Sequence, residues 1–311
     1  MRFNKYKILI GVFFYLILLK VQAQDCDLSY STQVKRIAIN DSVKVAYQEN
    51  GNAKTTLLMI HGLGGNSTHW QQNMKDLSKN FRCIALDLPG YGLSSMRVYQ
   101  SADMLEFYSS IILQFINKPK LKKVILVGHS MGGQIAIITS LKNVRAIKKL
   151  ILIAPAGLET FNETESKMLV QYSTPDFFKK QPEGAVRAGF QKNFFLMPKT
   201  AESLITDRLI MAKCAAFDPY FQMVAEGVKG MLKHPVRNQL KDIKIPTLVL
   251  YGENDELIPN KFLHKTLTTQ QVNDNAKEIN NVQIQGVSQA GHLVMLEQSE
   301  KCNQLITHFI K

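Results

Sequence analysis

The G-x-S-x-G segment at 128–132 constrains the fold more than any other part of the chain. An apolar run at 123–127 comes directly before it, and a helix-like stretch begins after it at Gly133. A buried strand that turns this sharply into a helix leaves little room around its central residue, and flanking glycines supply that room. The segment therefore predicts a strand–turn–helix unit that presents the Ser130 hydroxyl above a sheet, at the N-terminus of a helix.

Similar apolar runs recur along the chain and alternate with helix-like segments. The further predicted buried strands are 56–60, 81–86, 150–154, 247–251 and 282–287, and 35–46 alternates loosely enough for one or two antiparallel strands. The predicted helices are 70–78, 104–117, 134–141, 260–268 and 299–310. This alternation predicts an α/β fold with a mostly parallel sheet that is covered on both faces.

The alternation stops between 158 and 240, where helical patterns rich in Phe and Met take over. Prolines such as Pro175 and Pro219 divide this segment into short pieces. We interpret it as a helical cap inserted into the α/β domain. Most of its aromatic residues are expected to form the core of the cap, and a minority to line an apolar acyl pocket. The domains predicted are thus 1–23 signal peptide, 24–157 first part of the core, 158–240 cap and 241–311 second part of the core.

The N-terminus has the layout of a secretory signal peptide. Three basic residues precede the uncharged apolar stretch 8–19, and Ala23 supplies a small residue for cleavage. The stretch is shorter than the roughly 18 to 20 residues that a membrane-spanning helix needs. We therefore expect cleavage after Ala23 and export to the periplasm or the medium; the alternative is an uncleaved membrane anchor.

Charge and cysteine content narrow the classes of partner. The formal net charge of +13 is scattered along the chain, which favours peripheral contact with anionic surfaces such as phospholipid headgroups, and no aromatic-plus-basic motif predicts nucleic-acid binding.

An exported chain can form disulfides, and its cysteines permit three pairings, among which the sequence does not decide. Cys83 lies in an apolar run and is expected to be a buried small hydrophobe. The four cysteines, none with CxxC spacing, are Cys26, Cys83, Cys214 and Cys302.

A serine hydroxyl becomes a useful nucleophile when a base takes its proton and a carboxylate orients that base. Asp255 lies just past the end of a predicted strand, at the carboxyl edge of the sheet, and His292 follows the last predicted strand on a loop. We predict Ser130 as nucleophile, Asp255 as acid and His292 as base. Glu253 and Glu256 are the alternative acids. No His or Cys cluster predicts a metal site.

The glycine-rich segment 61–65 follows the predicted strand 56–60 and allows backbone N–H groups to approach a ligand. An oxyanion hole would combine an amide from this loop with the amide that follows the nucleophile. We predict Leu63 and Met131 as these donors. The candidate substrate-binding residues are Trp70, Phe194 and Phe221.

Taken in order, five segments resemble the α/β-hydrolase superfamily: 61–62, 87–94, 128–133, 252–255 and 291–292. Together, 128–134 and 154–158 resemble its capped monoacylglycerol-lipase and carboxylesterase branch. The resemblance implies hydrolysis of carboxylic esters through an acyl-enzyme without a cofactor, and the apolar cap suggests monoacylglycerols or medium-chain acyl esters.

Two other functions stay open at this point. Carbon–carbon bond hydrolases of the same fold share a serine elbow and the His-Gly segment followed by Trp70, whereas epoxide hydrolases and haloalkane dehalogenases carry an aspartate where this chain has Ser130. A ligand receptor without catalysis is the second alternative. The sequence does not decide the acyl specificity, the oligomeric state or whether the cap moves.

Overall fold

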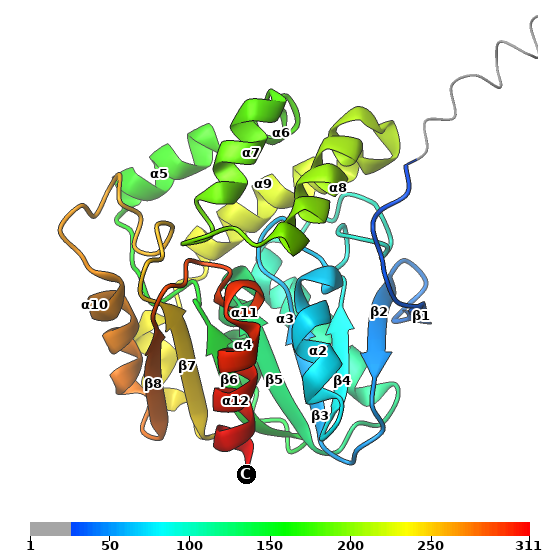
Figure 1. Ribbon diagram of the computed structural model, residues 1–311, viewed down its shortest axis with the longest axis vertical. Helices are drawn as coiled ribbons and strands as arrows, with labels where there is room; N and C mark the ends of the chain where they lie inside the picture. The colour runs from blue at the N-terminus through cyan, green and yellow to red at the C-terminus, as the bar shows by residue number, and fades with distance from the viewer. Residues whose placement is uncertain (1–25) are drawn as a thin grey trace, which may run out of the picture.

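A computed structural model provides the structure of the protein and describes residues 26–311 (Figure 1). The predicted signal peptide, 1–23, lies outside these residues. Eight strands form one sheet in the order β1-β2-β4-β3-β5-β6-β7-β8. Their bounds are β1 Val34–Ala38, β2 Lys44–Asn50, β3 Thr56–Ile60, β4 Arg82–Leu86, β5 Val124–His129, β6 Ile147–Ile153, β7 Thr247–Gly252 and β8 Val282–Val287.

The sheet is mostly parallel. β1 and β2 pair antiparallel, as do β2 and β4, and all other neighbours are parallel. β3, β5 and the last four residues of β4 are fully buried, as parallel strands covered on both faces must be. The predicted α/β class is therefore confirmed.

Alternate residues of each strand belong to different layers of the core. In β3, Leu58 and Ile60 pack in the layer of α3 and α4, whereas Leu57 and Met59 pack in the layer of α2 and α12. Side chains of a strand point alternately to its two faces, so one apolar run supplies both layers. The helices over the two faces are α2 Gln71–Leu77, α3 Met104–Asn117, α4 Met131–Ser140, α10 Thr269–Asp274, α11 Val294–Glu297 and α12 Ser299–Ile310.

Five helices stand between β6 and β7, within the segment for which a cap is predicted. Figure 1 shows them together over one end of the sheet. They are α5 Glu163–Tyr172, α6 Pro175–Lys179, α7 Glu183–Gln191, α8 Glu202–Lys213 and α9 Asp218–Lys233. α9 buries seven residues and contacts α3 and α4, whereas α5 and α6 bury none. α9 therefore joins this group of helices, hereafter the cap, to the core. Among the described residues, no helix is long and apolar enough to cross a membrane.

The predicted helix at 260–268 is wrong, because this segment consists of turns and α10 begins only at Thr269. The side-chain oxygen of Asn260 accepts hydrogen bonds from the backbone N–H groups of Phe262 and Leu263. Such local bonds offer the backbone an alternative to a helix. Thr268 then caps α10 by accepting from the N–H of Gln271.

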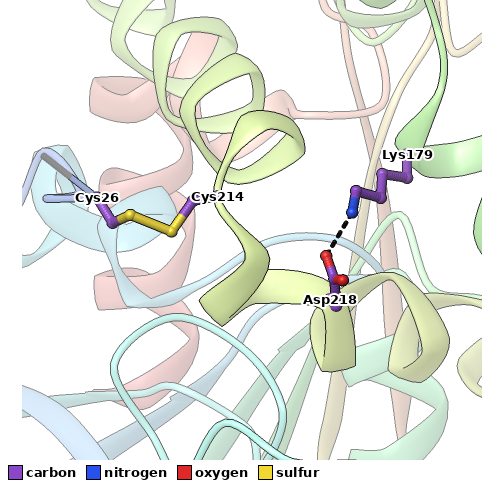
Figure 2. The surroundings of a disulfide bond; sticks show 4 residues. All are labelled: Cys26, Lys179, Cys214 and Asp218. Atoms are coloured by element: carbon purple, nitrogen blue, oxygen red, sulfur yellow. Dashed lines mark hydrogen bonds and ion pairs between the residues drawn. A yellow bond between two sulfur atoms is a disulfide. The ribbon is translucent and has the colours of Figure 1, made fainter. Parts of the chain in front are cut away.

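A disulfide joins Cys26 to Cys214, which decides among the pairings that the sequence left open (Figure 2). It connects the beginning of the described chain to the end of α8. The Ser29 N–H reinforces the connection by donating to Asp207 in α8 (2.9 Å). The two remaining cysteines of the described residues are buried and unpaired, Cys83 as predicted; they are Cys83 and Cys302.

Candidate active site

Ser130 stands between the last residue of β5 and the first of α4, with φ 51° and ψ −119°. A positive φ is rare for a residue with a side chain and costs on the order of 1–3 kcal/mol, so the surroundings must hold it. They do so through four backbone hydrogen bonds, among them one to β6 and one to the start of α4. The Ser130 N–H donates to the carbonyl of Ile153 in β6 (3.0 Å), and the Ser130 carbonyl accepts from Gly133 (2.8 Å).

The flanking glycines are required because the elbow has no free space. A Cβ on Gly132 would lie 2.4 Å from the carbonyl oxygen of Ile60, and one on Gly128 would lie 2.3 Å from the carbonyl oxygen of Gly132. Both contacts involve backbone atoms that cannot move away. The residue spacing recognised in the sequence thus has a direct steric cause.

Asp255 and His292, predicted as acid and base, meet at 2.8 Å between Oδ2 and Nδ1. Asp255 follows β7, and its other oxygen accepts the backbone N–H groups of Leu257 (2.8 Å) and Ile258 (3.0 Å). Both side chains are buried. With Nδ1 of neutral His292 donating to the carboxylate, Nε2 keeps its lone pair and can accept a proton.

The alternative acids differ from Asp255 in burial, and a second histidine, His129, lies beside His292. Glu253 and Glu256 are exposed at the surface, whereas Asp255 is buried. His129 lies beside His292, with ring centroids 4.8 Å apart, and its Nε2 bonds the His292 carbonyl (3.0 Å). Burial lowers the pKa of His129 well below its ordinary value, so this ring stays neutral next to His292.

The loop after β3 is held from the core side by a neutral histidine. Nδ1 of His61 donates to the Gly62 carbonyl (2.7 Å), and its Nε2 accepts from the N–H of Leu88 (3.1 Å). Burial lowers the pKa of His61 to about 4, which keeps the ring neutral, and the Leu88 N–H at Nε2 places the proton on Nδ1. Within the described residues, no hydrogen bond uses the N–H of Leu63, one of the predicted oxyanion donors. The other, Met131, is the first residue of α4.

A cavity of about 510 Å³ lies between the core and the cap. Ser130, His292 and Leu63 line it from the core, together with His69. Its size is in the range of sites for small organic ligands. The cap contributes one face of α9, on which the wall residues follow helical spacing: Tyr220, Val224, Val228 and Met231. Ser130, His292 and Leu63, which the sequence predicts in three distant segments, thus line one cavity.

Two charged side chains interrupt this largely apolar wall. Glu159 is fixed by Nδ1 of His264 (2.5 Å) and the N–H of Asn260 (2.9 Å), and burial raises its pKa. Arg208 of α8 lies over the rings of Tyr220 and Phe221, at 5.2 and 4.7 Å from their centroids. Within the described residues, no group of three or more acidic, His or Cys side chains could hold a metal ion.

The three aromatic residues predicted to bind substrate lie outside the cavity wall. Trp70 is fully buried in the layer of α2, Phe194 packs its backbone against the position of Gly291, and Phe221 is buried under Arg208. The aromatic rings in the wall are instead those of Phe161, Phe178, Phe190 and Tyr220. The helical spacing along α9 would have identified Tyr220, because it starts the apolar stripe that continues four residues later.

Comparisons with known proteins agree with the observed fold. A family model described as alpha/beta hydrolase fold matches residues 55–299. Human monoacylglycerol lipase ABHD6 is 26% identical over 83% of this chain and 75% of its own length. The pimeloyl-[acyl-carrier protein] methyl ester esterase of Wigglesworthia glossinidia brevipalpis is 28% identical over 84% of this chain and 95% of its own. The chain spans 66% of the acetyltransferase component of the acetoin cleaving system of Pseudomonas putida, at 26% identity.

Among solved structures, a probable hydrolytic enzyme from Pseudomonas aeruginosa is similar in fold. The TM-score is 0.80, and the match covers 91% of this chain and 96% of the other at 20% identity. At that identity the likeness concerns the fold alone.

Proposed function

Because the chain belongs to the α/β-hydrolase family, we propose that it is a serine hydrolase that cleaves carboxylic esters with Ser130, His292 and Asp255. One observation carries the proposal. The Ser130 turn and the buried His292–Asp255 pair come from separate segments, yet Ser130 and His292 line the same cavity. The similarity to a monoacylglycerol lipase and to a methyl ester esterase supports the same class of substrate.

In the proposed reaction, Nε2 of His292 takes the Ser130 proton while the serine oxygen attacks the ester carbonyl. Asp255 holds the ring orientation and stabilises the imidazolium that forms. The Leu63 and Met131 amides stabilise the oxyanion, and the alcohol leaves with the proton from His292. Water then attacks the acyl-enzyme with His292 as base. No cofactor takes part in these steps.

We propose medium-chain acyl esters or monoacylglycerols as the substrates, and the apolar wall of the cavity supports this proposal. Val224, Val228 and Met231 form an apolar stripe along its α9 wall. An acyl chain buried there gains about 0.8 kcal/mol for each CH₂ that leaves water. The affinity for esters should therefore rise with chain length until the cavity is filled.

We further propose that the protein is exported, with cleavage after Ala23. The disulfide between Cys26 and Cys214 supports this proposal, because such bonds persist in oxidising compartments. Mass spectrometry of the protein from the periplasm or medium should find Gln24 as its first residue. An intact N-terminus in the membrane fraction would instead support an anchor, with contact to the bilayer.

Hydrolysis of a chain-length series of nitrophenyl esters tests the function. Ser130→Ala should abolish turnover, by about 10⁴-fold or more, and prevent labelling by a fluorophosphonate. Asp255→Asn keeps the shape of the acid but stabilises the wrong tautomer of His292, and should lower kcat by up to about 10⁴-fold.

Other results would contradict the proposal. Hydrolysis that persists in purified Ser130→Ala protein excludes this serine as nucleophile. Cleavage of vinylogous diketones by a wild type that ignores esters would identify a carbon–carbon bond hydrolase. Binding without turnover of either class would identify a receptor.

A further inference from the structure

Tyr220 of cap helix α9 bonds directly to the loop that carries the predicted oxyanion donor. Its hydroxyl donates to the carbonyl oxygen of Gly64 at 2.7 Å. Gly64 follows Leu63 and has φ +71°, a conformation that residues with side chains rarely adopt. A cap helix and the loop after β3 are thus joined at the cavity, where Tyr220, Leu63 and Gly64 all lie in the wall.

This hydrogen bond is the first of a short chain that ends at Leu63. The carbonyl of Gly64 belongs to the same peptide group as the N–H of Gly65. That N–H donates to the carbonyl of Gly62 at 3.1 Å. The Gly62 carbonyl in turn shares its peptide group with the N–H of Leu63. Tyr220 therefore orients two peptide groups that are joined by a hydrogen bond, and the second of them presents the Leu63 N–H.

The two hydrogen bonds act in the same direction. A donor at the Gly64 carbonyl polarises that peptide group and makes the Gly65 N–H a stronger donor, and the same step repeats at Gly62 and Leu63. His61 also donates to the Gly62 carbonyl, from the core side. The Leu63 N–H is therefore supported by the core through His61 and by the cap through Tyr220.

The surroundings of Tyr220 keep its hydroxyl in place and protonated. Its ring packs edge-on against Tyr91 (5.6 Å between centroids) and Phe221 (5.1 Å), under the guanidinium of Arg208. Only 1% of the residue is exposed. Burial raises the pKa of Tyr220, so the hydroxyl remains a hydrogen-bond donor at neutral and moderately alkaline pH.

We propose that Tyr220 is a positioning residue of the oxyanion hole, through which the cap contributes to stabilisation of the transition state. The inference rests on the proposed serine-hydrolase function. Tyr220 does not touch the reacting atoms in this role, because its hydroxyl is directed to Gly64. Removing an oxyanion donor outright typically costs about 10²–10³ in rate, and loosening one should cost less, about tenfold.

Tyr220→Phe removes the hydroxyl and keeps the ring. The expected result is a kcat lowered about tenfold with KM for a medium-chain ester unchanged within about twofold. Affinity for a trifluoromethyl ketone, which forms a tetrahedral oxyanion on the serine, should fall by a similar factor. Tyr91→Phe is the matched control. Its hydroxyl is also buried and donates to a carbonyl of α9, that of Met223 (3.0 Å), but does not reach the loop.

The outcomes separate this inference from the proposed function. If Tyr220→Phe keeps the wild-type kcat and ketone affinity while a fluorophosphonate labels Ser130, the inference is wrong and the serine hydrolase stands. A change confined to KM would make Tyr220 a substrate contact and overturn it as well. Equal losses of kcat in Tyr220→Phe and Tyr91→Phe would show that both hydroxyls act only on the stability of the fold, which also overturns the inference. A wild type with neither labelling nor ester turnover contradicts the function itself.

Discussion

The Ser130 turn and the outer helices of the cap differ in how closely their residues are packed. All residues of β5 and α4 are buried, and a single added carbon at Gly132 would meet backbone atoms. In α5 and α6 no residue is buried, and a Cβ on Gly184 in α7 would meet nothing within 4 Å. The contrast teaches that close packing positions the Ser130 turn, whereas the outer cap can change in sequence without disturbing it.

A pair of glycine substitutions tests this contrast where it is largest. Gly132→Ala forces a methyl group against the carbonyl oxygens of Ile60 and His61, at 2.4 and 2.5 Å. We expect a loss of about 3 kcal/mol or more in the free energy of unfolding. Gly184→Ala adds the same methyl group to an open helix position and should stabilise the protein by about 0.5–1 kcal/mol. Urea denaturation of both variants measures the difference, and equal midpoints would refute the contrast.

The disulfide should have the next largest effect, on stability and not on catalysis. Replacing both Cys26 and Cys214 by Ser frees the N-terminal segment from the cap. Loss of a native disulfide typically costs about 2–5 kcal/mol, and the two residues are 188 apart in the sequence. The unfolding midpoint should fall while kcat for esters stays within about twofold, because the predicted triad belongs to the core.

A reducing agent provides the control for that prediction. It should lower the midpoint of the wild type to that of the double variant and leave the variant unchanged. A large loss of kcat in the double variant would mean that the core does not position the reacting groups without the cap's covalent attachment.

The smallest effect is expected for an ion pair inside the cap. Lys179 of α6 forms an ion pair with Asp218 at the start of α9 (Figure 2). Nζ and Oδ1 are 2.5 Å apart, and the two side chains are 32% and 49% exposed. Exposed pairs of this kind contribute about 0–1 kcal/mol. Lys179→Ala should therefore shift the midpoint only slightly and leave ester hydrolysis intact. A loss comparable to that of the disulfide variant would show that the outer cap is as tightly specified as the core.

Most of the core could be predicted because its signals are local. The helices 104–117 and 299–310 match α3 and α12 in the structure, and the G-x-S-x-G spacing follows from contacts within a few ångströms of Ser130. The order of the predicted acid and base along the chain sufficed to suggest the His292–Asp255 pair, which the structure places at 2.8 Å.

What sequence reasoning missed depends on contacts between distant segments. Nothing near Cys26 in the sequence indicates that Cys214 lies beside it, since the two are 188 residues apart and meet only through the packing of the cap. The hydroxyl of Tyr220 finds the Gly64 carbonyl 156 residues away. Phe194 and Phe221 resemble wall residues in composition. Phe221 differs from Tyr220 in the face of α9 on which it lies, and Phe194 differs from Phe190 because it lies in the loop after α7.

The disulfide also determines what a protease can release. It closes a covalent ring from Cys26 to Cys214 that contains Ser130 and the exposed helices α5 and α6, whereas Asp255 and His292 lie beyond it. Exposed segments are the preferred sites of cleavage. A cut within α5 or α6 would open the ring without dividing the molecule, so the fragments would migrate together until reduction and apart after it.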